Sequence, residues 1–133
     1  MTILRPDQVS DWITGKANRA FSRHIQNDQG RLAKANPKAT GRMAASWRIA
    51  QNSPDTSTES ESYSGDGEPR PYNGEITMDG TWHLSNNVPY AHRVAKDPKW
   101  AKGGDGGAAW YDSIVNASRG RLEEELRNEF RGQ

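Results

Sequence analysis

The segment from Pro6 to Ile25 reads PDQVSDWITGKANRAFSRHI, and it decides the architecture of the chain. Pro6 suits a first helical turn because its missing N–H would be unpaired there anyway, and Asp7 complements the positive helix end. The pattern predicts a helix that begins near Pro6 and ends near Gly30 or before Pro37. Its apolar residues recur three and four positions apart, on one expected buried face: Val9, Trp12, Ile13, Ala17, Ala20, Phe21 and Ile25.

A second helix is predicted at the other end of the sequence. Its apolar stripe is Ile114, Val115, Ser118, Leu122, Leu126 and Phe130. The residues between these stripe positions include Glu123, Glu124 and Glu125, which point in different directions and are typical of a solvated face.

The middle of the chain predicts strands. Residues 46–51 alternate polar and apolar, with Trp47 and Ile49 on one side. Asp79-Gly80, flanked by residues 75–78 and 81–85, is a strong signal for a β-hairpin. We expect Ile76, Met78 and Leu84 on the buried face of that hairpin, and Trp47, Trp82 and Tyr90 in a core shared by the sheet and the helices.

These elements predict one domain spanning residues 1–133. Its class is α+β: a small antiparallel sheet, with a long N-terminal helix and a C-terminal helix packed on one face. Residues 53–73 are rich in Ser, Thr, Asp, Glu, Gly and Pro, so we expect a mobile acidic loop there. A Gly-rich loop is expected at residues 96–107.

The composition excludes several classes of site. The 133 residues include no cysteine, which excludes disulfides, thiolate metal sites and a cysteine nucleophile. Only 32% of the residues are hydrophobic, so either part of the chain is disordered or neighbouring subunits complete the burial. No stretch approaches the ~18 apolar residues of a membrane span, and residues 1–6 show no signal-peptide core.

No catalytic pattern is present in the sequence. His24, His83 and His92 have no metal-ligand spacing, and residues 103–107 are glycine-rich but lack the Gly-Lys-Ser/Thr ending of a phosphate loop. We therefore expect no catalytic residue, no metal and no cofactor, and a protein that is not an enzyme. An accessory subunit of an enzyme stays open, although no residue argues for it.

Charge is distributed unevenly along the chain. Residues 1–52 hold nine Lys/Arg and three Asp/Glu, whereas residues 53–80 hold one Arg and seven Asp/Glu. This asymmetry predicts two surfaces for different partners, or simply a solvated helix followed by a solvated loop. The alternative function is a nucleic-acid-binding module that uses the basic N-terminal helix. Against it, the helix aromatics are expected on the buried side, where they cannot stack on bases.

Five side chains form the hypothetical partner interface. Trp100 and Trp110 lie in or beside glycine-rich sequence and are candidate contact anchors, because tryptophan is enriched at interface hot spots. The alternative is that both tryptophans cap the sheet edge locally. Tyr63 is the aromatic anchor of the acidic loop, and Arg19 and Arg23 lie off the apolar stripe of the first helix.

Two segments resemble a known family. Residues 40–47, TGRMAASW, resemble the Thr-Gly-x-Leu-x-x-Ser segment that enters the first strand in tail-completion (neck, or tail-terminator) proteins of tailed bacteriophages. Residues 84–94, LSNNVPYAHRV, are similar to the Asn-Asn-x-Pro-Tyr-Ala-x-x-(Leu/Ile/Val) signature of the same family. Ala95 stands where that family often has a glutamate. The signature positions are Thr40, Gly41, Ser46, Asn86, Asn87, Pro89, Tyr90 and Ala91.

The resemblance implies a structural component of the virion, assembled in the host cytoplasm and located in the tail neck. Such a protein forms a ring, commonly of six subunits, between the tail tube and the head-closure or connector proteins. DNA passes through the ring without specific binding, and neither catalysis, a cofactor nor a membrane is involved. On this interpretation the acidic loop either lines the channel or docks on a partner ring, and docking is preferred because Tyr63 offers an anchor.

Overall fold

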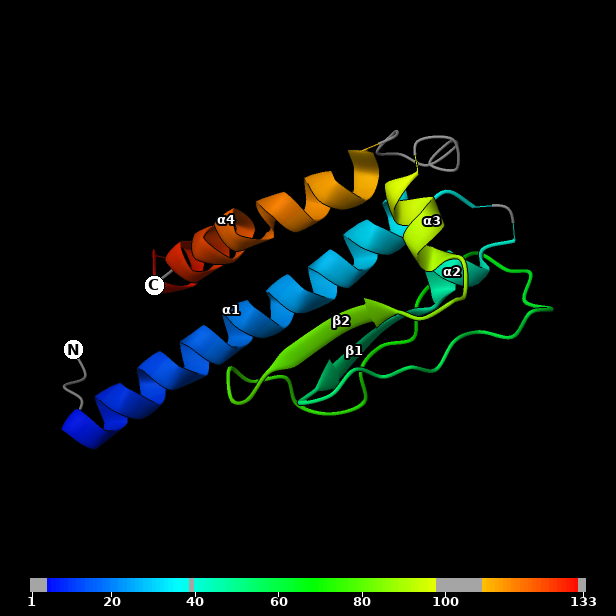
Figure 1. Ribbon diagram of the computed structural model, residues 1–133. Helices are drawn as coiled ribbons and strands as arrows, with labels where there is room; N and C mark the ends of the chain where they lie inside the picture. Colours follow the sequence, from blue (N-terminus) through cyan, green and yellow to red (C-terminus); the bar gives the residue numbers. More distant parts are fainter. Residues whose placement is uncertain (1–4, 39, 98–108, 132–133) are drawn as a thin grey trace.

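The computed structural model describes residues 5–38, 40–97 and 109–131 and shows an α+β fold (Figure 1). A long N-terminal helix packs against both a two-stranded antiparallel sheet and a long C-terminal helix, which confirms the predicted fold class. The elements are α1 (Pro6–Ala35), α2 (Arg42–Ala45), β1 (Trp47–Gln51), β2 (Trp82–Asn86), α3 (Ala91–Lys96) and α4 (Trp110–Arg131).

Helix α1 begins at the predicted proline and continues past Gly30 to Ala35, so it ends just before Pro37. Its middle and its C-terminal half are buried, at Ala20, Ile25 and Leu32 among others. Its first turns project beyond the end of α4 (Figure 1). The prediction of a buried stripe is therefore wrong for the tip, where the apolar residues Val9, Trp12 and Ile13 are 37%, 41% and 46% exposed.

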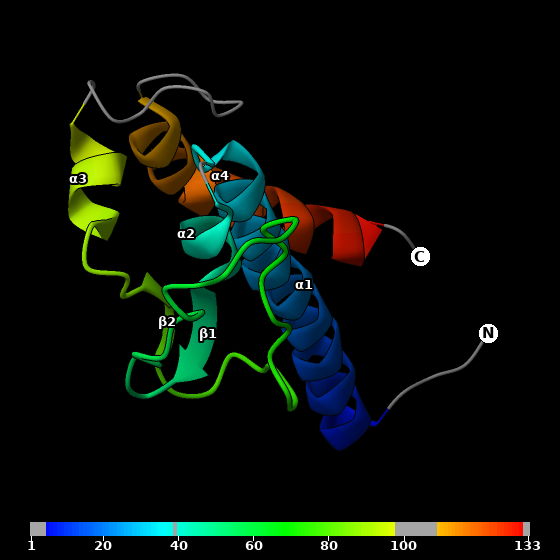
Figure 2. The same cartoon turned by 90° about the vertical axis from the view of Figure 1, so that its right-hand side faces the viewer.

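The two long helices lie side by side, and the start of α1 and the end of α4 meet at the same end of the molecule (Figures 1 and 2). There Trp12 makes an edge contact with Phe130, with ring centroids 5.9 Å apart. The predicted apolar stripe of α4 is only partly buried: Ile114, Leu122 and Leu126 are half-buried and Val115 is 44% exposed.

The sheet pairs two segments that are distant in sequence. β1 and β2 are antiparallel, with Ile49 opposite Leu84, so β1 matches the predicted strand. The predicted hairpin is wrong, because residues 75–78 form no strand and β2 pairs with β1 instead. The backbone N–H of Met78 donates to Asn18 Oδ1 of α1 at 2.8 Å, and the Met78 side chain is 47% exposed. Ile76 is buried as predicted, against Ile25 and Ile49.

The main core lies where α1, β1 and α4 converge. Trp47 is 4% exposed, and its indole N–H donates to Asn36 Oδ1 at 3.0 Å. Trp82 is half-buried against Phe21 and Tyr72, so the core prediction holds only in part for this residue. The core prediction is wrong for Tyr90, which is 36% exposed.

Helix α3 occupies a segment for which no helix or strand is predicted from the sequence. Val94 is its buried residue and anchors it to the main core. The helix ends at Lys96, where the predicted Gly-rich loop begins, and most of the range of that loop, residues 98–107, lies outside the described residues.

Candidate functional site

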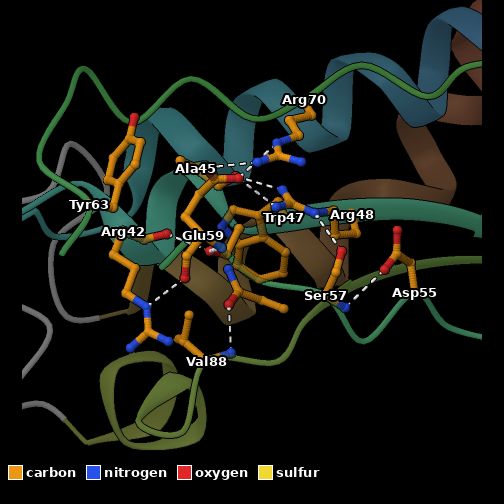
Figure 3. Close-up of polar contacts among 12 residues, drawn as sticks. Arg42, Ala45, Trp47, Arg48, Asp55, Ser57, Glu59, Tyr63, Arg70 and Val88 are labelled. Carbon is orange, nitrogen blue, oxygen red and sulfur yellow. Dashed lines mark hydrogen bonds and ion pairs between the residues drawn. The ribbon is translucent and has the colours of Figure 1, made fainter. Parts of the chain in front are cut away.

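A buried arginine on β1 holds the acidic insert, residues 53–73, against the sheet (Figure 3). Arg48 is 4% exposed, and its Nη2 lies 2.6 Å from Glu59 Oε2. The same guanidinium donates through Nη1 to Ala45 O at 2.7 Å and through Nε to Ser57 Oγ at 3.2 Å. All three nitrogens of the guanidinium are therefore used within the chain.

Glu59 is the centre of this cluster. Its carboxylate also accepts from Arg70 Nη2 at 3.2 Å and lies 2.9 Å from Arg70 Nε, and its backbone N–H donates to Ser46 Oγ at 3.0 Å. Burial would raise the pKa of the Glu59 carboxyl, but the hydrogen bonds from Arg48 and Arg70 outweigh it and hold the pKa below its usual value. The insert lacks helix and strand, yet Glu59, in its first half, is fixed to the sheet.

The insert returns past the start of α2, where Tyr63 lies. The Tyr63 hydroxyl accepts a hydrogen bond from the Gly67 backbone N–H at 3.2 Å, and the ring is half-buried. Gly41 has φ +82°, and a Cβ at this position would lie 2.8 Å from the Gly65 carbonyl oxygen. Gly41 therefore serves both a left-handed turn and a close approach of the insert.

The first signature segment is a helix start. Thr40 Oγ1 accepts from the Arg42 backbone N–H at 3.2 Å, and Ser46 Oγ donates to Arg42 O at 2.6 Å. Because Ser46 is fully buried and also receives the Glu59 N–H, it joins α2, β1 and the acidic insert.

The second signature segment packs against the first. Asn86 Nδ2 donates to Met43 O at 2.7 Å, and Val88, which is 3% exposed, shares the main core with Met43. Across the same corner the Arg42 guanidinium lies 5.9 Å from the centre of the Tyr90 ring. The two segments, some forty residues apart in sequence, therefore form one structural corner.

Trp110 does not lie on the surface, so its predicted role as a contact anchor is wrong. It is 0% exposed, its ring centroid lies 6.4 Å from that of Trp47, and its indole N–H donates to Val94 O at 3.4 Å. A sequence signal existed, because Trp110 lies four residues before Ile114 and so extends the α4 stripe by one turn. Trp100 lies outside the described residues.

Arg19 and Arg23 make contacts within the chain. Arg19 Nε lies 3.0 Å from Glu129 Oε1, and Arg23 bonds both Glu129 at 2.7 Å and Glu125 at 3.2 Å. These bonds hold the pKa of Glu129 below its usual value. Lys16 is buried, with Nζ 3.1 Å from Glu129 O. Much of the basic face of α1 is thus directed at α4.

A serine, a histidine and an aspartate gather between α1 and α4, which the sequence reasoning missed. His24 Nε2 lies 3.0 Å from Ser118 Oγ and 3.3 Å from Asp28 Oδ2, while Ser118 Oγ donates to Asp28 Oδ2 at 2.5 Å. In a nucleophilic triad the carboxylate binds the opposite ring nitrogen from the serine. Here both partners face Nε2, so the ring is not oriented as a general base toward Ser118.

Over the described ranges 5–38, 40–97 and 109–131, no group of three His, Asp or Glu side chains is placed to hold a metal ion. In the same ranges no helix is both long enough and apolar enough to span a bilayer. Comparison with known proteins finds no matching family model, curated protein or solved structure.

Proposed function

We propose that this chain is a structural subunit of the neck of a tailed-bacteriophage virion. In this role it forms a ring at the head-proximal end of the tail and joins the tail tube to the head connector. The two segments that resemble tail-completion proteins support the proposal. The observation that carries it is the corner that these segments build, where Asn86 Nδ2 donates to Met43 O and Ser46 Oγ donates to the carbonyl of Arg42, the first residue of α2.

The signature residues stabilise the backbone at this corner. Thr40, Ser46 and Asn86 satisfy backbone groups, and Gly41 supplies the left-handed turn. The proposal therefore assigns the chain an assembly role without catalysis or cofactor.

Assembly into a ring would cover surfaces that the single chain leaves open. A two-stranded sheet is marginal by itself and has two edges, and closed rings bury such edges between subunits. The projecting tip of α1 adds an apolar stripe of Val9, Trp12 and Ile13. We propose that a neighbouring copy or a partner ring packs on this tip while DNA passes through the central channel without specific binding.

The nucleic-acid-binding alternative gains no support from the geometry. Lys16 is buried, and Arg19 and Arg23 are paired with carboxylates of α4. Phosphate contacts would have to break these pairs, which weakens the electrostatic attraction on which such binding depends. We therefore propose the neck role alone.

The test uses a phage or prophage that encodes the chain. Deletion of the gene is expected to give filled heads and separate tails by electron microscopy, and an antibody against the chain is expected to label the neck of normal particles. Joined, infectious particles from the deletion strain would overturn the neck role.

A pair of matched variants separates the neck role from the proposed contact at the tip. Ile13→Glu at the tip should fail to restore joining, whereas Val115→Glu, at a similarly exposed apolar site on α4, should restore it. Restoration by both variants would leave the neck role standing and reject the tip as the contact surface.

A further inference from the structure

Two members of the polar cluster between α1 and α4 are buried. The side chains of His24 and Asp28 are each 8% exposed. The groups that face His24 come from both helices: Asp28 and Arg31 from α1, and Ser118, Arg121 and Glu125 from α4. On the β2 side its neighbours around the adjoining cavity, Trp82 and Leu84, are uncharged.

The hydrogen bonds determine where the proton of His24 lies. The Ser118 hydroxyl donates its hydrogen bond to Asp28 Oδ2 at 2.5 Å and so faces His24 as an acceptor. Nε2 of His24 therefore carries the ring hydrogen and directs it toward these two side chains. Nδ1 is then an acceptor, and it is buried with no hydrogen-bond partner among the described residues. A second proton would create an N–H at Nδ1 that has nothing to donate to.

Charge disfavours that second proton as well. Burial lowers the pKa of His24 most strongly, Asp28 opposes this, and Arg121 and Arg31 lower the pKa further. The packed arrangement of the two helices therefore favours the neutral imidazole over the charged form. If the helices separated at this point, water would solvate the charged imidazolium. That would remove the cost of burying the charge and the cost of an unpaired N–H at Nδ1.

A pocket that is open to the surface adjoins the cluster. It has a volume of about 460 Å³ and is lined by the cluster and by the apolar side chains Phe21, Ile25, Trp82, Leu84 and Leu122. Movement of α4 away from α1 would expose the buried His24 ring to the water of this pocket.

We propose that His24 is a proton-operated latch: its protonation opens the middle of α4 from α1. Because one proton is taken up on opening, the ratio of open to closed molecules rises by up to about tenfold for each pH unit below the ordinary histidine value of about 6.5. The latch is a property of this helix pair and does not depend on the neck function.

Hydrogen–deuterium exchange read by mass spectrometry tests the latch on the full chain. Between about pH 7.5 and about pH 5.5 the carboxylates stay charged, so histidines dominate the change. After correction for the intrinsic exchange rate, residues 113–122 of α4 should lose roughly tenfold in protection, while residues 47–51 of β1 change little. The loss should disappear in His24→Gln and persist in His83→Gln and His92→Gln.

An equal loss of protection in wild type and His24→Gln would overturn the latch, as would a loss that is uniform over the whole chain. If His24→Gln fails to fold, an NMR titration of ring-labelled wild type decides the matter. A His24 ring that titrates at or above the ordinary value rejects the proposal, and one that titrates below it together with the α4 loss supports it.

Discussion

Replacing Glu59 by Gln should destabilise the fold by about 3 kcal/mol, because it removes the carboxylate from a buried arginine. Breaking a buried ion pair on one side costs about 3–5 kcal/mol. Arg48 is 5% exposed in its side chain and keeps Ala45 O and Ser57 Oγ as partners, which places the expected loss at the lower end. Total stabilities of about 5–15 kcal/mol make this a large fraction.

Urea unfolding followed by circular dichroism measures the loss. Arg70→Ala is the matched control, because Arg70 binds the same carboxylate but its side chain is 70% exposed. Exposed pairs contribute about 0–1 kcal/mol, so this variant should remain close to wild type. The double variant Arg48→Met with Glu59→Leu should recover most of the loss, since apolar replacement of a buried pair is often neutral.

The same pair predicts a dependence of stability on pH. The pKa of folded Glu59 lies below its unfolded value, so the unfolded chain binds more protons as the solution becomes acidic. The stabilisation is therefore present above about pH 4.5 and is lost as the pH falls through the folded pKa. Glu59→Gln should flatten, without abolishing, the acid limb of the stability curve, because Asp55 also has a lowered pKa.

A Glu59→Gln loss below about 1 kcal/mol, or one equal to that of Arg70→Ala, would refute the reasoning. The insert would then be attached to the sheet by contacts other than this carboxylate.

Two further substitutions test the structure elsewhere. Gly41→Ala should destabilise the fold by about 1–3 kcal/mol, because a Cβ at φ +82° is strained and would meet Gly65 O. Gly30→Ala is the control, because Gly30 has open space around it in α1, and equal urea midpoints for the two variants would contradict the strained turn at Gly41. Trp110→Ala should cost about 3–5 kcal/mol by the same titration, since the side chain is fully buried; a loss below about 1 kcal/mol would restore Trp110 as a surface residue.

Local patterns in the sequence were enough for the two long helices and for β1. Periodicity of three and four places Ala20, Phe21 and Ile25 on one face of α1, and alternation places Trp47 and Ile49 on one face of β1. Both patterns are properties of residues close in sequence, so they can be read without knowledge of the rest of the fold.

The partner of each element was decided by the tertiary structure. Asp79-Gly80 predicted a local hairpin, but Asn18 of α1 takes the Met78 N–H, and β2 pairs with β1. Burial was decided in the same way. The stripe of α1 is exposed at Val9 and Ile13 near the N-terminal end of the helix, and Trp110 is buried because Trp47 lies opposite it.

The ion pairs show the same limit. Arg48 and Glu59 are eleven residues apart, and nothing in their spacing indicates that the insert folds back onto the sheet. His24, Asp28 and Ser118 meet only because α1 and α4 are antiparallel neighbours in the required register. A sequence pattern fixes the direction of a side chain within its own element, whereas the contact that pairs or buries it depends on packing between distant segments.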